Sequence, residues 1–455
     1  MKVFGSSGVR GVALDELTPA YALDIAQAAG DVFAEDADRV AVGRDSRKTG
    51  EMFVHAVASG LASVGCGVDC LGVVPTPSLQ AYCGREGVPG VMVTASHNPP
   101  EYNGIKLIGD SGVELTRDAL YRVERLLGDG PALTTWADTG SIRTVDGANR
   151  SYREELLAAV DRERIEAADL TVALDPGNGA GAVTSPAVFR ELGCAVKTIN
   201  ARADGTFPGR DPEPVAANLD DLGRLVRAAD ADIGIAHDGD ADRAIFFDET
   251  GSFVEGDTAL AALAATDLQS GNTLVSAVNA SQRLVDVVES AGATLELAPI
   301  GSTYIITAIR RLQSEGKSVT IAGEGNGGVI FPRYRVARDG AYTAARFLEL
   351  LADADAPASE AVAAYDGYEN VRRNLAYESE SEREAMLDAL ERTARAADAD
   401  LTTIDGYRLD YGDAWVLARP SGTEPVVRVY AEARSADRAR ELADGMVDTA
   451  ESATE

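Results

Sequence analysis

The amino-acid sequence predicts an α/β protein of several domains that ends in an α+β module. At 455 residues the chain is too long for one hydrophobic core, so three or four domains are expected. Short apolar runs typical of strands alternate with longer amphipathic stretches typical of helices, which favours parallel sheets with both faces covered. This alternation stops near residue 366, and we place domain boundaries near residues 150, 250 and 365.

Six apolar runs are strand candidates: RVAVGRD (39–45), PGVMVTAS (89–96), LTVALDPG (170–177), DIGIAHD (232–238), NTLVSAV (272–278) and SVTIAGEG (318–325). Helices are predicted over 18–33 and 184–193, among others. Three strand-then-loop units (VMVTASHN, DIGIAHDGDADR and VTIAGEGNGG) recur at roughly even intervals, which indicates repeated domains of one α/β design. Beyond residue 366 the order is strand, long helix, short strands and a hairpin-like end, which predicts an α+β module.

The composition limits location and partners. The net charge is −31, from 73 acidic and 42 basic residues spread over the whole length, and only five of the basic residues are lysines. The absence of a basic stripe argues against nucleic acid as a partner, and the excess of acid predicts a protein adapted to a salt-rich cytoplasm. No apolar run approaches the ~20 residues that span a bilayer, and the N-terminus lacks the apolar core of a signal peptide, so we expect a cytoplasmic protein without membrane contact.

The four cysteines do not form a recognisable metal site. Cys66 and Cys70 have the spacing of a ligand pair, but no second Cys/His pair follows. We expect Cys66, Cys70, Cys83 and Cys194 to be free thiols.

The stretch VTASHNPPEYNGIK (93–106) contains Ser96 beside His97. Side chains of sequence neighbours point apart, so His97 is poorly placed to be the general base of a Ser-His-Asp relay. The serine therefore needs a different chemical explanation.

The run DGDADR (238–243) predicts a metal site. Asp238, Asp240 and Asp242 follow an apolar strand and offer the hard oxygen ligands that suit Mg²⁺. An EF-hand is disfavoured because its sixth position needs Gly and is Arg243 here. A phosphatase-type Asp-x-Asp nucleophile leaves Ser96 unexplained, and a solvated acidic turn is the alternative without function.

The run RPSGTEPVVR (419–428) suits a phosphate. Ser421, Gly422 and Thr423 offer hydroxyl and unobstructed backbone N–H donors, and Arg419 and Arg428 frame them with guanidinium groups. An ordinary polar turn is the alternative.

Two further loops are weaker signals alone. GEGNGG (323–328) carries Glu324 and Asn326, which suit sugar hydroxyls, and FGSSGVRG (4–11) ends near Arg10. A metal site, a phosphate clamp, a polyol loop and a serine without a triad together indicate a serine that carries a phosphoryl group, since phosphoryl transfer needs mainly positioning and charge stabilisation.

These five motifs, in this order, resemble the α-D-phosphohexomutase family over essentially the whole chain. FGSSGVRG is similar to its N-terminal active-site loop, TASHNPPEYNGIK to its phosphoserine loop, DGDADR to its metal loop, GEGNGG to its sugar loop and RPSGTEPVVR to its phosphate loop. The resemblance implies three related α/β domains with mixed sheets (1–150, 151–250 and 251–365) and a C-terminal α+β domain (366–455) around a central active-site cleft.

The resemblance also implies a role for each site residue. Phosphorylated Ser96 exchanges its phosphate with a hexose monophosphate through a sugar bisphosphate, and one Mg²⁺ is held by Asp238, Asp240, Asp242 and a phosphoserine oxygen. Lys106 is expected to transfer protons with a pKa lowered by burial near other cations. Arg10 and His97 are expected to assist at the transferring phosphoryl group. The expected substrate-binding residues are Arg243, Gly301, Thr303, Glu324, Asn326, Arg419, Ser421, Gly422, Thr423 and Arg428.

Two departures from the family pattern concern the sugar. The sugar loop of many relatives is Glu-x-Ser-Gly-His, and here Asn326 replaces the Ser and Gly328 the His. PIGSTYI (299–305) lacks the basic or imidazole group that many relatives carry in that loop. RPSGTEP followed by RVYAEA resembles the phosphoglucosamine mutase and archaeal-type phosphomannomutase branches more than the classical phosphoglucomutases. From this resemblance we expect glucosamine phosphate as the substrate, with mannose or glucose phosphate as the alternative.

We expect a monomer or homodimer that acts on a small hexose phosphate and is activated by a sugar 1,6-bisphosphate. A metal-dependent sugar phosphatase that forms a phospho-aspartate at Asp238, and a non-catalytic sugar-phosphate sensor, are the rival hypotheses. An intact Ser96–Lys106 segment argues against both.

Overall fold

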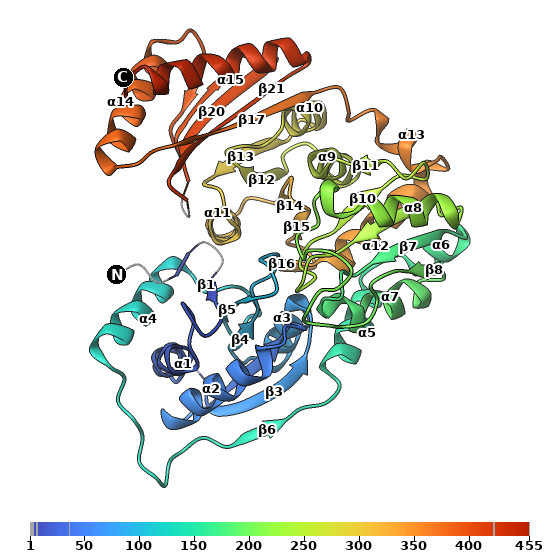
Figure 1. The fold of residues 1–455 in the computed structure, drawn as a ribbon. Helices are drawn as coiled ribbons and strands as arrows, with labels where there is room; N and C mark the ends of the chain where they lie inside the picture. The colour runs from blue at the N-terminus through green and yellow to red at the C-terminus, as the bar shows by residue number, and fades with distance from the viewer. Residues whose placement is uncertain (1–3, 6–7, 36, 422–423, 455) are drawn as a thin grey trace. The chain divides into compact units, whose positions relative to one another are not determined.

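The computed structural model describes residues 4–5, 8–35, 37–421 and 424–454, and its chain divides into two compact units (Figure 1). Unit 1 comprises residues 1–259 and 326–362, and unit 2 comprises 260–325 and 363–455. No described helix combines the length and the apolar character that crossing a bilayer requires.

The first sheet of unit 1 is mixed and has the order β1-β5-β4-β2-β3-β6. Its central strand β2 runs parallel to β3 and β4, whereas β5 is antiparallel to both β4 and β1. Its elements are β1 (Val9–Val12), α1 (Pro19–Phe33), β2 (Arg39–Arg44), α2 (Gly50–Ser63), β3 (Gly67–Val73), α3 (Thr76–Glu86), β4 (Gly90–Val93), β5 (Tyr102–Ile108), α4 (Arg117–Asp129) and β6 (Ile142–Thr144).

The second sheet of unit 1 repeats this design in the order β11-β10-β9-β7-β8. Strand β7 is parallel to β8 and β9, and β10 is antiparallel to β9 and β11. The elements are α5 (Ala148–Ala158), α6 (Arg162–Ala167), β7 (Thr171–Asp175), α7 (Ser185–Glu191), β8 (Ala195–Thr198), α8 (Asp220–Ala228), β9 (Ile233–Ala236), β10 (Ile245–Phe247) and β11 (Phe253–Val254).

The third α/β domain contributes to both units. Unit 2 contains the parallel strands β13-β12-β14, and unit 1 contains the antiparallel pair β15 and β16. The elements are α9 (Gly256–Asp267), β12 (Thr273–Ala277), α10 (Gln282–Ala291), β13 (Thr294–Ala298), α11 (Ser302–Ser314), β14 (Val319–Glu324), β15 (Gly328–Phe331), β16 (Arg335–Arg338), α12 (Gly340–Ala354) and α13 (Ala358–Ala363).

Unit 2 ends in an antiparallel sheet of order β17-β21-β20-β19-β18, one face of which is covered by α14 and α15 (Figure 1). Met386 and Leu390 of α14 and Leu442 and Met446 of α15 are buried in one apolar cluster with the strands. The elements are β17 (Glu369–Ala376), α14 (Glu380–Ala396), β18 (Asp400–Thr402), β19 (Tyr407–Asp410), β20 (Ala414–Pro420), β21 (Val426–Ala433) and α15 (Ala436–Glu451).

The six predicted strands and the two predicted helices are all present, within a few residues of their expected ends. The expectation of parallel sheets is met in part, since each α/β sheet is parallel up to one edge (β6, β8 or β13) and has antiparallel strands at the other edge. The C-terminal helix α15 was not predicted.

Local side-chain chemistry explains several boundaries. The Thr18 hydroxyl accepts a hydrogen bond from the N–H of Tyr21 and caps α1, and Pro19 occupies its first turn. The Asp339 carboxylate accepts one from the N–H of Tyr342 and caps α12. These caps explain where α1 and α12 begin.

Candidate active site

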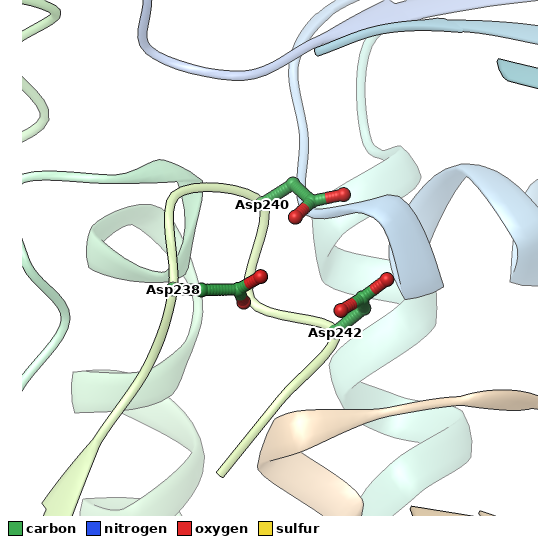
Figure 2. Close-up of side chains that lie close together, drawn as sticks. All are labelled: Asp238, Asp240 and Asp242. Carbon is green, nitrogen blue, oxygen red and sulfur yellow. The ribbon is translucent and has the colours of Figure 1, made fainter. Parts of the chain in front are cut away.

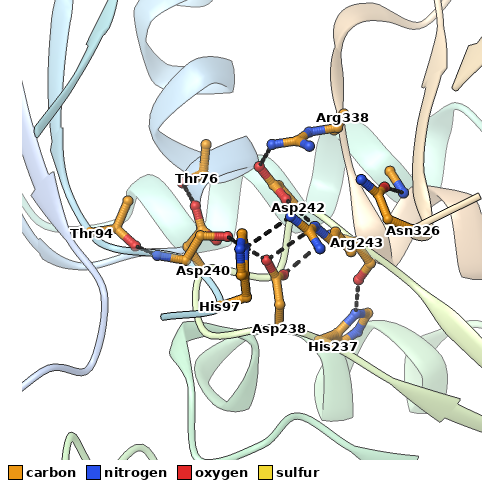
Figure 3. A network of polar contacts seen from close by, with 12 residues as sticks. Thr76, Thr94, His97, His237, Asp238, Asp240, Asp242, Arg243, Asn326 and Arg338 are labelled. Atoms are coloured by element: carbon orange, nitrogen blue, oxygen red, sulfur yellow. Dashed lines mark hydrogen bonds and ion pairs between the residues drawn. The ribbon is translucent and has the colours of Figure 1, made fainter. Parts of the chain in front are cut away.

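Polar side chains of unit 1 gather where the chain leaves β4 and β9. Ser96 and His97 follow β4, the three aspartates follow β9, and Lys106 lies on β5 beside β4. Figure 3 shows the network that joins these loops.

Ser96 has an unusual backbone conformation, and its hydroxyl points at a carboxylate. Its φ of 52° lies in the left-handed region, which non-glycine residues seldom adopt. Its Oγ donates to Asp238 Oδ2 at 2.7 Å, whereas His97 Nδ1 is 3.5 Å away. The geometry thus agrees with the inference that His97 is not the general base of Ser96.

A buried ring of side chains stabilises this conformation, and the sequence motifs did not reveal it. The Ser96 N–H donates to Thr94 Oγ1 (2.8 Å), Thr94 Oγ1 donates to Asp45 Oδ2 (2.7 Å), and Asp45 pairs with Arg47 (3.1 Å). Arg47 closes the ring by donating to the carbonyl of Ser96 at 2.9 Å and also binds that of Asn98 at 2.6 Å. The signal in the sequence is GRDSR (43–47), which directly follows the β2 run.

The three aspartates converge on one point (Figure 2). One oxygen from each of Asp238, Asp240 and Asp242 lies within 4.8 Å of the others, and all three side chains are buried. Oδ1 of Asp240 and Oδ1 of Asp242 have no hydrogen-bond partner among the described residues. Buried carboxylate oxygens without partners are costly, and hard oxygens suit a divalent cation, so the three residues fit a metal ion.

Gly239 lets the two loops meet. A Cβ at this position would lie 2.5 Å from the carbonyl oxygen of Ser96, closer than any side chain tolerates. The glycine between the first two aspartates is therefore required by the close approach of the serine loop.

The prediction that the pKa of Lys106 is lowered is wrong. Its Nζ lies 2.9 Å from Asp240 Oδ2 and 3.2 Å from Asp242 Oδ2. Burial alone would lower the pKa of Lys106, but the two carboxylates outweigh it and the pKa is raised. The pKa of Asp240 is lowered against the effect of burial, because Lys106 and the Thr76 hydroxyl stabilise its charge. Burial and the two neighbouring carboxylates raise the pKa of Asp238 to about 7.

The other cations predicted for this site lie beside Ser96. Arg243 donates to His97 Nδ1 at 2.9 Å, and Arg10 donates to Asn98 Oδ1 at 2.8 Å. Burial and then Arg243 and Arg10 lower the pKa of His97 to about 2, so its imidazole is neutral. Burial lowers the pKa of Arg10 to about 10, which leaves the guanidinium charged at neutral pH.

The predicted phosphate clamp lies in unit 2, where Arg419 and Arg428 face each other across β20 and β21. Like charges directly opposite in an antiparallel pair destabilise a sheet. Arg419 pairs with Asp405 at 3.1 Å and Arg428 pairs with Glu424, yet Nε of each arginine has no partner among the described residues. Two facing cations with unused donors are suited to an anion.

The remaining predicted substrate residues are distributed over both units. Gly301, with φ 128°, precedes α11, and Thr303 in its first turn is buried. Glu324 ends β14 in unit 2, while Asn326 begins the second segment of unit 1 and accepts a hydrogen bond from the N–H of Gly328. Ser421 follows β20. Gly422 and Thr423 lie outside the described residues.

Four family models match the chain in succession. They describe the α/β/α domains I (residues 1–130), II (150–251) and III (255–368) and the C-terminal domain (374–449) of phosphoglucomutase/phosphomannomutase.

Relatives are similar over nearly their whole length. A phosphoglucomutase/phosphomannomutase of Thermococcus kodakarensis is 39% identical, with 97% of this chain and 96% of that protein covered. A probable phosphoglucosamine mutase of Methanopyrus kandleri is 40% identical, with 98% and 97% covered. The crystal structure of a phosphoglucomutase/phosphomannomutase family protein from Burkholderia thailandensis is 28% identical and superposes with a TM-score of 0.86, covering 99% of this chain and 97% of that one.

Relatives of this kind are isomerases, and the predicted fold of three mixed α/β domains and a C-terminal antiparallel-sheet domain is confirmed. The chain is an enzyme of the phosphohexomutase family, the phosphoglucomutases and phosphomannomutases.

Proposed function

We propose that the enzyme interconverts hexose 6-phosphate and hexose 1-phosphate by way of phosphorylated Ser96. The observation that carries the proposal is the 2.7 Å contact between Ser96 Oγ and Asp238, inside a cluster of three buried carboxylates and without a base positioned for a hydrolase relay. A serine so placed suits a phosphoryl carrier whose charge is balanced by a cation.

We assign Mg²⁺ to Asp238, Asp240, Asp242 and an oxygen of phosphorylated Ser96. When bound, the ion would neutralise charge on the transferring phosphoryl group.

Side chains of unit 1 are assigned separate roles in the two steps of the reaction. In the forward step the bond between Ser96 Oγ and phosphorus breaks while a sugar hydroxyl oxygen bonds to phosphorus, which gives a sugar bisphosphate. The sugar hydroxyl releases one proton and Ser96 Oγ takes one up, so the protons balance. In the return step the other phosphoryl group moves to Ser96 Oγ. Lys106 enters protonated because of its two carboxylate partners, so it can supply the proton that the departing serine oxygen takes up. Arg10 and neutral His97 support the transferring phosphoryl group, and Arg243 contacts substrate.

The phosphate that does not react is assigned to Arg419, Ser421, Gly422, Thr423 and Arg428. The sugar hydroxyls are assigned to Glu324 and Asn326, and Gly301 and Thr303 are assigned to substrate binding as well. Four domains bounded near 150, 250 and 365, a cytoplasmic location and activation by a sugar 1,6-bisphosphate belong to the same proposal.

We propose glucosamine 6-phosphate as the substrate, with mannose or glucose 6-phosphate as the alternative. Support comes from relatives in Methanopyrus kandleri and Methanococcoides burtonii that are described as probable phosphoglucosamine mutases, 40% and 36% identical.

The test combines peptide mapping with turnover. The purified protein is incubated with glucose 1,6-bisphosphate and Mg²⁺, and phosphate on Ser96 is measured by mass spectrometry. Conversion of glucosamine, mannose and glucose 6-phosphates is then followed. Phosphate on Ser96 and 1-phosphate product from one sugar are expected, and Ser96→Ala should lose both. A Ser96→Ala variant that still releases inorganic phosphate would establish a phosphatase instead.

A further inference from the structure

The space beside Gly328 is filled by the side chain of Arg338. A Cβ built on Gly328 would lie 2.6 Å from Cδ of Arg338. Both residues belong to unit 1, where β15 and β16 are antiparallel neighbours and Ile330 is registered with Arg338. Position 328 is where the sequence departs from Glu-x-Ser-Gly-His, so the structure offers a reason for the missing side chain: an arginine from the next strand takes its place.

Arg338 reaches from this position to the metal-site carboxylates (Figure 3). Its NH2 lies 2.6 Å from Asp242 Oδ2, and its side chain is only 6% exposed. Lys106 contacts the same oxygen at 3.2 Å. Two cations contact Oδ2, whereas Oδ1 of Asp242 has no hydrogen-bond partner among the described residues and lies 3.9 Å from Arg243 Nε. Oδ1 is therefore the oxygen more available to a metal ion.

The backbone on either side of Arg338 is firmly anchored. Arg335, at the other end of β16, donates to the carbonyl of Pro77 at 3.1 Å and pairs with Glu155. Asp339, the next residue, caps α12 and accepts a hydrogen bond from the Tyr152 hydroxyl at 2.7 Å. A side chain that emerges between two such anchors can orient the group it binds.

We propose that Arg338 is a positioning residue that orients Asp242 for the metal ion, and that Gly328 and Arg338 form an exchangeable pair in which only one position can carry a large side chain. The inference rests on the proposed metal site at Asp238, Asp240 and Asp242. It predicts that Arg338→Ala weakens Mg²⁺ binding about 10- to 100-fold, the loss typical when a group that orients a metal ligand is removed.

The pair is tested by four variants: Arg338→Ala, Gly328→His, the double variant that carries both changes, and the control Arg153→Ala. Mg²⁺ affinity is measured by calorimetry on the metal-free protein, phosphorylation of Ser96 by mass spectrometry after addition of glucose 1,6-bisphosphate, and unfolding by a thermal melt. The control removes a partly buried arginine of α5 whose ion-pair partner is Glu191 (3.5 Å) and not a metal-site aspartate, so it should keep Mg²⁺ affinity.

Gly328→His should bind Mg²⁺ more weakly, because the imidazole collides with the side chain of Arg338. In the double variant the space that Arg338 occupied should accept the imidazole. The double variant should then bind Mg²⁺ at least about tenfold more tightly than the product of the two single effects predicts, since contacting residues are non-additive. If Arg338→Ala fails to fold, Arg338→Lys takes its place and should give an intermediate affinity.

Wild-type Mg²⁺ affinity in Arg338→Ala, or strictly multiplicative effects in the double variant, would overturn the proposal. A wild-type protein that binds Mg²⁺ but never gains phosphate on Ser96 refutes the proposed function alone, because the comparison of Mg²⁺ affinities remains valid.

Discussion

The facing pair Arg419 and Arg428 predicts that one substitution will affect stability and substrate affinity independently. Arg428→Met removes one of two like charges that lie directly opposite on β20 and β21. Relief of that repulsion is worth about 0.2–1 kcal/mol. The substitution also removes the ion pair with Glu424, a half-exposed pair of the kind worth about 0.2–1 kcal/mol. The two effects oppose each other, so stability should change by no more than about 0.8 kcal/mol.

Substrate affinity should respond much more strongly. A hydrogen bond to a charged group contributes about 1.5–3 kcal/mol, and each 1.4 kcal/mol is a factor of ten. Arg428→Met should therefore raise KM for hexose phosphate about 10- to 150-fold, while the melting temperature moves by no more than about 2 °C. KM is measured by a coupled assay of 1-phosphate product, and unfolding by circular dichroism.

Arg372→Met is the matched control, because Arg372 is an exposed arginine of the neighbouring strand β17. It should leave both KM and melting temperature unchanged. The reasoning is refuted if Arg428→Met leaves KM at the wild-type value, or if it lowers the melting temperature by many degrees, as loss of a packing residue would.

Three further predictions concern protons, thiols and salt. Lys106→Met should lower kcat about 10²- to 10⁴-fold, which is the usual contribution of a proton-transfer group. The control Lys197→Met, at an exposed position, should retain the wild-type kcat. A wild-type kcat in Lys106→Met would show that Lys106 has no part in the mechanism. Burial raises the pKa of Cys66 to about 11 and that of Cys194 to about 12, so both thiols are protonated at pH 8. Iodoacetamide at that pH should leave them unmodified in the native protein and alkylate them after denaturation. Rapid alkylation of the native protein, measured by mass spectrometry, would contradict their burial. With a net charge of −31, the melting temperature should rise as KCl screens self-repulsion, and an identical melting curve in dilute buffer would show that the charge is tolerated without salt.

The sequence allowed the prediction of features that depend on local pattern. Strands such as 232–238 are short apolar runs bounded by polar loops, and the carboxyl ends of such strands carry the motifs that meet in unit 1. Helix α15 was equally local: Ser435 caps it by accepting a hydrogen bond from the N–H of Arg438, and this signal was overlooked.

What could not be predicted depends on residues distant in the chain. The raised pKa of Lys106 depends on its contacts with Asp240 and Asp242, which no spacing around residue 106 reveals. Likewise nothing near Gly328 in sequence indicates that the guanidinium of Arg338 fills its side-chain space. Local pattern located the candidate site residues, and the tertiary contacts determine their charge state and orientation.

The discontinuous make-up of unit 1 has a consequence for synthesis on the ribosome. Residues 326–362 belong to unit 1, so the unit is incomplete when residue 259 emerges. At 5–20 residues per second, the roughly 100 residues up to 362 take about 5–20 s to appear. During that time the Tyr152 hydroxyl and the N–H of Asp161 lack their partners Asp339 and Glu349. The nascent N-terminal segment must therefore remain soluble with these polar groups uncovered until α12 is made.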